Sequence, residues 1–395
     1  MGGMLTNIYN NIGFALNLNT KAIMKLQEQT STGARINRIS DEPSSAYQLL
    51  GLNSQKRDLQ SYLDNISQAG DVFQVTSNVL NDMVSSISQA QVNLTQISSG
   101  TYDQAGRERM AEQINDVLEQ MLSQANTMHM SQYVFSGGKA ATAPYVAERT
   151  DGKITSVTYQ GSDQSRNVEI SPSVQSSLFY AGQDLFSSNS RSEPVFYGST
   201  GAAAGSGTSS VKGDIWLTVT NDGSNYKLSI DGGATETTVP SSGDISNIAV
   251  TNAQGQVLYV NATAITATGT NLVRVPGTYD IFNSLISIRD ILSNENNLSD
   301  SQLNEFRDTI TQSLEEVRSH LVNRQVSVGF KIGFLENLKE SFENIKFNNE
   351  EQTSGIEQAD IAQIAIDLSR REVLYQMSLS VAGKLMSISL LDFME

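Results

Sequence analysis

Cysteine is absent from the 395-residue sequence, and histidine occurs only twice. The lack of cysteine excludes disulfides, thiolate metal ligands and a thiol nucleophile. The two histidines, His129 and His320, lie in stretches with a helical pattern and have no second ligand-type residue at a metal-binding spacing. A single histidine on a helix is usually a surface or core residue. We therefore expect no metal centre and no cofactor.

Positive charge is scarce as well. The chain has 26 lysines and arginines against 42 aspartates and glutamates, which gives a formal net charge of −16. This excess of negative charge disfavours nucleic acids and anionic membranes as partners. Residues 1–60 differ from the rest, because they carry six basic and four acidic side chains. The acidic excess therefore lies beyond residue 60.

Long uninterrupted hydrophobic runs are missing. The most apolar stretch, residues 373–393, carries Lys384 near its middle together with Gln376 and several serines. A charged side chain at that depth is costly in lipid, so we predict no membrane insertion. Residues 5–26 alternate asparagine and threonine with apolar side chains, whereas a signal peptide has an apolar block. We therefore expect no cleavable signal peptide.

A seven-residue hydrophobic repeat marks the first half of the chain. It runs without interruption through Leu59, Ile66, Phe73, Leu80, Ile87 and Leu94. This period predicts a long amphipathic helix over residues 44–98 with a coiled-coil-like stripe. We expect a return helix over residues 103–129 and, in the second half, helices over residues 279–293 and 299–346. The last of these keeps the same period, so we predict one bundle built from both halves of the chain.

Between these helices the pattern changes to that of strands. Residues 154–170 predict a β-hairpin that turns at Gly161, residues 198–213 predict a linker of small residues, and Asn221-Asp222-Gly223 predicts the turn of a second hairpin. With further short strands over residues 235–239 and 257–260, we predict an inserted β-rich domain that is separable from the bundle. It holds no phosphate-binding loop, acid–base pair or nucleophile arrangement, so we predict that the protein is not an enzyme and has no catalytic residues.

Both ends of the chain carry apolar stripes at helical spacing. The residues that we expect to take part in assembly are Leu5, Ile8, Ile12 and Leu26 near the N-terminus, and Ile361, Leu368, Leu385, Leu390, Leu391 and Phe393 near the C-terminus. The C-terminal stripe alone can bury too little apolar surface to offset the entropy lost on ordering it. We therefore predict coiled-coil helices that are completed by each other and by neighbouring copies. An ordinary helix pair within one chain is the alternative.

Three short motifs resemble the flagellin superfamily. The first is the run Ser-Thr-Gly-Ala-Arg-Ile-Asn-Arg-Ile-Ser-Asp-Glu-Pro, which begins at Ser31. The second is Gln-Tyr-Val-Phe-Ser-Gly-Gly-Lys, which begins at Gln132, and the third is the closing Ser-Leu-Leu-Asp-Phe, which begins at Ser389. Within the superfamily these motifs are more similar to the hook–filament junction proteins than to filament flagellins. The opening Met1-Gly2-Gly3 departs from the family pattern.

The patterns and the resemblance together predict a mainly α fold with β insertions. The expected architecture is a multi-domain rod, in which terminal coiled-coil helices and a long-helix bundle with a β-hairpin carry an inserted β-rich domain. We expect assembly helices at residues 1–43 and 355–395, bundle segments at residues 44–180 and 277–354, and the inserted domain at residues 181–276. In the first motif, Arg35, Asn37 and Asp41 are further candidates for assembly contacts.

The resemblance also implies a function: a structural subunit of the bacterial flagellum that joins the hook side to the flagellin filament and supports swimming motility. The implied partners are the first hook-associated protein, flagellin, other copies in a ring and a flagellar export chaperone. The implied location is extracellular, at the hook–filament junction, after secretion by type III export. Filament flagellin itself and a secreted adhesin or needle-tip-like interaction protein are the alternatives.

Overall fold

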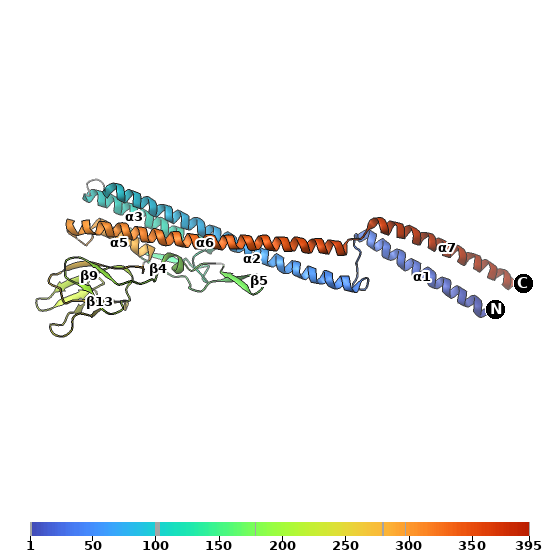
Figure 1. Cartoon of the computed structure of the whole chain (residues 1–395), viewed down its shortest axis with the longest axis horizontal. Coiled ribbons are helices and arrows are strands. Elements are labelled where there is room, and N and C mark those ends of the chain that lie inside the picture. The colour runs from blue at the N-terminus through green and yellow to red at the C-terminus, as the bar shows by residue number, and fades with distance from the viewer. Residues whose placement is uncertain (1, 99–102, 178, 279, 297, 395) are drawn as a thin grey trace. The chain divides into compact units, whose positions relative to one another are not determined.

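The computed structural model describes residues 2–98, 103–177, 179–278, 280–296 and 298–394 (Figure 1). It is mainly helical with β insertions, as the sequence predicts. The chain divides into two compact units: the first holds Met1–Asp64 and Leu338–Glu395, and the second holds Asn65–Asn337. Two long helices, α2 (Pro43–Ser98) and α6 (Asp300–Glu357), contribute residues to both units. Within the described ranges, no helix is long and apolar enough to cross a membrane.

The hydrophobic repeat of α2 lies in the core of the second unit. The repeat positions of α2 in this unit are all buried: Ile66, Phe73, Leu80, Ile87 and Leu94. The matching positions of α6 are buried as well: Leu314, Leu321, Val328 and Leu335. At the bundle surface, Gln91 of α2 donates a hydrogen bond to Glu315 of α6 at 3.0 Å. The predicted bundle from both halves of the chain is therefore confirmed.

The return helix α3 (Gln104–Ala125) is shorter than predicted, because Asn126 ends it. The Asn126 side chain donates to the Tyr145 carbonyl at 2.9 Å and accepts from the Tyr145 N–H at 3.0 Å. A two-stranded ladder of β1 (Met128–His129) and β2 (Gln132–Tyr133) follows. The short helix α4 (Gly182–Phe186) comes later, and α5 (Ile281–Ser293) packs along α3.

The single hairpin predicted over residues 154–170 is wrong. β4 (Lys153–Tyr159) pairs instead with β3 (Tyr145–Thr150), which precedes it. The turn between them is formed by Asp151 and Gly152, which both have positive φ, 52° and 81°. Two successive left-handed residues favour a tight hairpin turn, and this pair outcompetes the turn expected at Gly161. A second small hairpin follows, formed by β5 (Asn167–Ser171) and β6 (Val174–Ser177).

The β-rich insertion contains two antiparallel sheets, with strand orders β11-β10-β9-β14-β7 and β12-β13-β8. Their strands are β7 (Val195–Tyr197), β8 (Ala203–Ala204), β9 (Gly213–Asn221), β10 (Tyr226–Ser229), β11 (Thr237–Thr238), β12 (Ile248–Thr251), β13 (Val257–Asn261) and β14 (Gly269–Val275). Alternate side chains of both sheets form a shared apolar core that includes Leu217, Val219, Leu228, Val250, Leu258 and Val260. The hairpin predicted around Asn221-Asp222-Gly223 is confirmed as the β9–β10 pair.

The insertion contacts the bundle, and its predicted separability from the bundle stays a prediction. Tyr197 of β7 and Trp216 of β9 contact Phe306 of α6, with ring centroids 6.2 and 6.1 Å apart. Arg274 of β14 reaches the same helix, where its Nη2 lies 2.9 Å from the Glu316 carboxylate. These contacts cover a fully buried phenylalanine of the bundle, so the insertion and the bundle belong to one compact unit.

Candidate assembly site: terminal helices and elbow

The first unit brings the two ends of the chain together. α1 (Gly2–Thr32) packs along α7 (Ile361–Met394), and the two termini lie at the same end of this pair (Figure 1). Of the predicted assembly residues, Ile12, Leu26 and Leu368 are half-buried, whereas Ile361 is exposed. The other predicted members of the two stripes lie outside the described side chains, and their role stays a prediction: Leu5, Ile8, Leu385, Leu390, Leu391 and Phe393.

A polar pair marks the register of the two helices. Asn19 interrupts the apolar stripe of α1, and Arg371 interrupts that of α7. The Arg371 Nη1 donates to the Asn19 side-chain oxygen at 3.2 Å, so the two interruptions face each other. This contact is solvent-exposed, so it marks the alignment of α1 against α7 and contributes little to its stability.

The elbow between α1 and α2, residues 33–42, is hydrogen-bonded to the junction between α6 and α7. Gly33 ends α1 with a φ of 71°, as expected for a helix-terminating glycine. The Arg35 N–H donates to the Glu357 carbonyl at 2.7 Å, and the Ala359 N–H donates to the Gly33 carbonyl at 3.0 Å. These bonds form a small antiparallel bridge. The end of α1 and the beginning of α7 are therefore held together at this bridge, which we call the common base.

The side chains of the predicted elbow residues strengthen this base. Arg35 donates through Nε and Nη2 to the Ile356 carbonyl at 3.2 and 3.0 Å, and its Nη2 lies 3.5 Å from the Glu42 carboxylate. The Asn37 side chain donates to the Ala34 carbonyl at 3.2 Å. Arg35 thus ties the elbow to the end of α6, and Asn37 tightens the elbow itself.

Asp41 is the most connected carboxylate of the elbow. It accepts the backbone N–H groups of Asn37 at 3.3 Å and Arg38 at 3.0 Å, and it lies 3.1 Å from the Lys25 ammonium of α1. The hydrogen bond from Lys25, followed by that from the Arg38 backbone, holds the pKa of Asp41 below its usual value. The structure therefore brings the three elbow candidates together, and their contacts lie within one chain.

The terminal helices also expose apolar side chains that the sequence analysis did not single out. On α7 they recur at spacings of seven and four residues, and each is more than half exposed: Ile366, Val373, Met377 and Val381. On α1 the exposed apolar side chains are Phe14, Leu18 and Met24. We call these residues the outer apolar face. The α7 members form a second stripe in the sequence beside the first one, and an exposed apolar stripe of this kind is typical of a surface that another chain covers.

The second motif has a packing role, as its aromatic residues suggest. Phe135 is fully buried, with its ring centroid 5.0 Å from that of Phe186. Gly137 has a φ of 59°, and a Cβ there would lie 2.0 Å from the Ser162 carbonyl oxygen. Only glycine fits such a position without moving the backbone. The motif therefore contributes to the core at the point where the chain passes from α3 to the β-hairpins.

The buried histidine of the second unit is held in place by packing and by a hydrogen bond to the backbone. His320 is buried, its Nε2 lies 2.7 Å from the Leu185 carbonyl oxygen, and burial lowers its pKa. In the part of the chain that the structure describes, no three histidine, aspartate or glutamate side chains are grouped so that they could hold a metal ion.

The N-terminal third of the chain matches a known protein region. Residues 6–140 match the bacterial flagellin N-terminal helical region. Over these residues the chain is similar to bacterial flagellins. The match spans most of α1, the elbow, α2, α3 and the second motif, so it covers the first two of the three motifs on which the resemblance was based. That resemblance is confirmed.

Two curated relatives share part of this chain. Flagellar hook-associated protein 3 of Escherichia coli (strain K12) is 30% identical over 175 residues, which are 43% of this chain and 53% of the relative. The flagellar filament 41 kDa core protein of Borreliella burgdorferi is 32% identical over 120 residues, which are 29% of this chain and 35% of the relative. The chain thus spans about half, or less, of the length of the curated relatives it matches.

A solved structure shares the fold over a longer stretch. The flagellar junction protein FlgL from Legionella pneumophila covers 78% of this chain with 100% of its own, at a TM-score of 0.51 and 16% sequence identity. At this identity the likeness concerns the fold. The shared fold covers a larger share of this chain than the curated relatives match.

Proposed function

We propose that this chain is a structural subunit of the bacterial flagellum that joins the hook side to the filament, and that it is not an enzyme. The observation that carries the proposal is the outer apolar face, which lies on a helix pair made from both ends of one chain. The relationship to hook-associated protein 3 and the fold shared with a flagellar junction protein support the junction as the place of action.

Assembly follows from the physics of the terminal helices. Each exposed leucine, valine, isoleucine, phenylalanine or methionine contributes about 1.5–3 kcal/mol when it becomes fully buried. Neighbouring copies bury the outer apolar face when their terminal helices pack side by side as a coiled coil. The elbow holds α1 and α7 on one base, so both helices enter the assembly together.

The partners follow from this mode of assembly. Other copies in a ring cover the sides of each helix pair, the first hook-associated protein meets the ring on the hook side, and flagellin meets it on the filament side. A flagellar export chaperone covers the apolar C-terminal helix before assembly, and the subunit acts outside the cell after secretion. The second unit has its own buried core among the described residues.

Filament flagellin is the second candidate, because the relative from Borreliella burgdorferi is a filament core protein. Fewer residues match that relative than match hook-associated protein 3, and the shared fold of the junction protein covers more of the chain. These observations favour the junction subunit.

Electron microscopy of cells that lack the protein tests the proposal. We expect hooks without filaments, together with unassembled flagellin in the culture medium, because export continues while the filament has no base. Hooks without filaments and without any flagellin in the medium would favour the filament candidate. Long, normal filaments would contradict both.

A further inference from the structure

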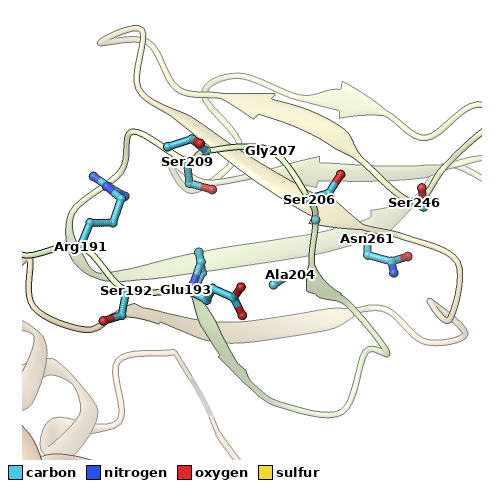
Figure 2. Close-up of a pocket in the computed structure, with 12 residues that line it drawn as sticks. Arg191, Ser192, Glu193, Ala204, Ser206, Gly207, Ser209, Ser246 and Asn261 are labelled. Atoms are coloured by element: carbon cyan, nitrogen blue, oxygen red, sulfur yellow. The ribbon is translucent and has the colours of Figure 1, made fainter.

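The β-rich insertion contains an open cleft that has no part in the proposed assembly. It has a volume of about 670 Å³, within the range of about 300–1,000 Å³ typical of small-molecule sites. Residues 191–194 before β7 line one side, and residues 204–209 after β8 line the other. Figure 2 shows Arg191 and Ser209 at one end, Ser246 and Asn261 at the opposite end, and Glu193 and Ala204 between them.

The wall of residues 204–209 is rigidly held against β13. The Gly205 N–H donates to the Tyr259 carbonyl at 3.0 Å, and the Tyr259 N–H donates to the Ser209 hydroxyl oxygen at 3.0 Å. A Cβ on Gly207 would lie 2.3 Å from the Tyr259 ring, and one on Gly205 would lie 2.6 Å from the Asn247 side-chain oxygen. The glycines therefore let this segment lie flat on the sheet, and the wall exists before any ligand binds.

The charged end of the cleft is fixed as well. Arg191 donates through Nη1 to the Val211 carbonyl at 2.9 Å and through Nη2 to the Ser210 carbonyl at 3.3 Å. A guanidinium has five N–H donors, so donors are left for a ligand. Glu193 lies nearer the middle of the cleft, with an exposed side chain that can accept hydrogen bonds.

The composition of the lining selects a class of ligand. Arg191 and Glu193 balance each other in charge, and the remaining polar groups are mainly hydroxyls and an amide, including Ser206, Ser246 and Asn261. An anionic ligand such as a nucleotide would meet the Glu193 carboxylate and a chain of net charge −16. An apolar ligand would leave these groups without hydrogen-bond partners. A neutral ligand with many hydroxyl groups satisfies donors and acceptors together.

We propose that this cleft binds a neutral saccharide. Its sugar hydroxyls accept from Arg191 at one end and donate to Glu193 near the middle. At the other end they donate to the Ser246 hydroxyl oxygen, because that hydroxyl itself donates to Asp244. They accept there from the Asn261 side-chain N–H groups, because the Asn261 oxygen accepts from Thr263. The elongated arrangement in Figure 2 suits a short oligosaccharide better than a single ring. The proposal is independent of the flagellar role, because none of its residues lies in the terminal helices.

Titration calorimetry of the full-length chain with maltotriose, chitotriose, N-acetyllactosamine and the acidic probe sialyllactose tests the proposal. We expect saturable binding of at least one neutral probe and weaker binding of sialyllactose. Ser206→Trp should abolish binding by filling the cleft, and Glu193→Gln should weaken it about tenfold or more by removing a charged acceptor.

Matched controls lie on the same insertion outside the cleft. Ser224→Trp in the β9–β10 turn and Glu236→Gln, whose carboxylate pairs with Lys227, should leave both binding and the melting temperature unchanged. Three results would each overturn the proposal: no saturable binding of any neutral probe at millimolar concentration, binding that survives both cleft substitutions, or a preference for sialyllactose.

Discussion

At the scale of single residues, two carboxyl groups beside the insertion make the stability of the second unit depend on pH. Burial raises the pKa of Asp214 and of Asp280 from 3.8 to about 6 in each case. The folded chain therefore binds these protons more tightly than the unfolded chain does. Their contribution to the free energy of unfolding is largest at low pH, falls as pH rises from about 4 to about 6, and then levels off.

Asp280 offers the cleaner test of this effect. Its carboxylate caps α5 by accepting the N–H groups of Phe282 and Asn283 at 2.9 and 3.1 Å. Asp280→Asn keeps an acceptor and removes the buried charge, so the free energy of unfolding near neutral pH should rise by about 1–2 kcal/mol. The difference between wild type and variant should shrink as pH falls from about 6 to about 4. Urea unfolding across this pH range measures both effects.

The control for this prediction is Asp280→Ala. It removes the same charge but also leaves the first turn of α5 without its cap, which costs about 1 kcal/mol. It should therefore be less stable than Asp280→Asn at every pH. A variant Asp280→Asn whose pH dependence equals that of the wild type would contradict the role assigned to this carboxyl group.

A second residue-scale prediction concerns Gly33, where α1 ends. No atom lies within 4 Å of the position that a Cβ would take, so the cost of Gly33→Ala comes from its φ of 71° alone. We expect a loss of about 1 kcal/mol in the stability of the elbow. Hydrogen exchange in α1 and α7 should become faster by about fivefold.

Gly51→Ala is the matched control. Gly51 lies within α2 in the same unit, also with open space around its Cβ position, but in helical conformation. Alanine is favoured over glycine there by about 1 kcal/mol, so this variant should be as stable as the wild type or more so. Equal effects of the two substitutions would show that the left-handed turn at Gly33 is not what holds the elbow.

At the scale of elements, the insertion is attached to α6 through Arg274. Its Nη1 donates to the Thr309 carbonyl at 3.0 Å and to the Ser313 hydroxyl, and its Nε lies 3.9 Å from the Asp214 carboxylate. Arg274→Met would leave Asp214 without its nearest cation in a site where its side chain is only 6% exposed. We expect a loss of about 3 kcal/mol in the free energy of unfolding of the second unit, measured by thermal melting.

Exposed Arg166 provides the control for this attachment. Arg166→Met should change stability by no more than about 0.5 kcal/mol. If Arg274→Met melted like Arg166→Met, the insertion would be held by its aromatic contacts alone.

The elements show which parts of this fold can be predicted from sequence. A seven-residue period that runs from Leu59 to Leu94 marks its helix without ambiguity, because the buried side chains of α2 repeat once per two turns. The hairpins were harder to predict, because the turn at Asp151–Gly152 and the turn expected at Gly161 are only nine to ten residues apart. Of the two, only the Asp151–Gly152 pair supplies two left-handed residues. The attachment of the insertion was not predictable, since it depends on Phe306 and Arg274, which are thirty-two residues apart and carry no periodic signal.

The candidate site was predictable in the same uneven way. The elbow residues Arg35, Asn37 and Asp41 were predicted from a motif, and the structure supplies their contacts within the chain. Their part in assembly stays a prediction. The outer apolar face was missed because its members, such as Val373 and Met377, sit beside the main stripe. Which of two stripes a partner helix covers is decided by packing, which composition and spacing do not reveal.

At the scale of the whole molecule, the two units differ in how large a hydrophobic core each contains. The second unit buries large side chains completely, including Phe73, Phe135, Phe186, Phe282 and Phe306, whereas within the described side chains of α1 and α7 only Ile364 is buried. A purified monomer should therefore have weakly protected terminal helices. Limited proteolysis should remove about the first forty and the last forty residues and leave the second unit intact. Protection of both ends in a chain shown to be monomeric would contradict this prediction.

The central claim is that the outer apolar face is covered by other subunits during assembly. A charged side chain on this face would be buried without a partner, at a cost of several kcal/mol per subunit. The double variant Val373→Asp and Met377→Asp changes two side chains that are 55% and 60% exposed in the single chain, so its folding and melting should stay unchanged. Gln376→Asp is the control, because it introduces the same aspartate side chain at an exposed polar position of the same helical turn.

The decisive measurement is electron microscopy of cells that produce only one of these variants, with the exported protein quantified in the medium. The account predicts that the double variant is exported and folded but leaves hooks without filaments, whereas Gln376→Asp restores filaments. Normal filaments on cells that export the double variant would contradict it.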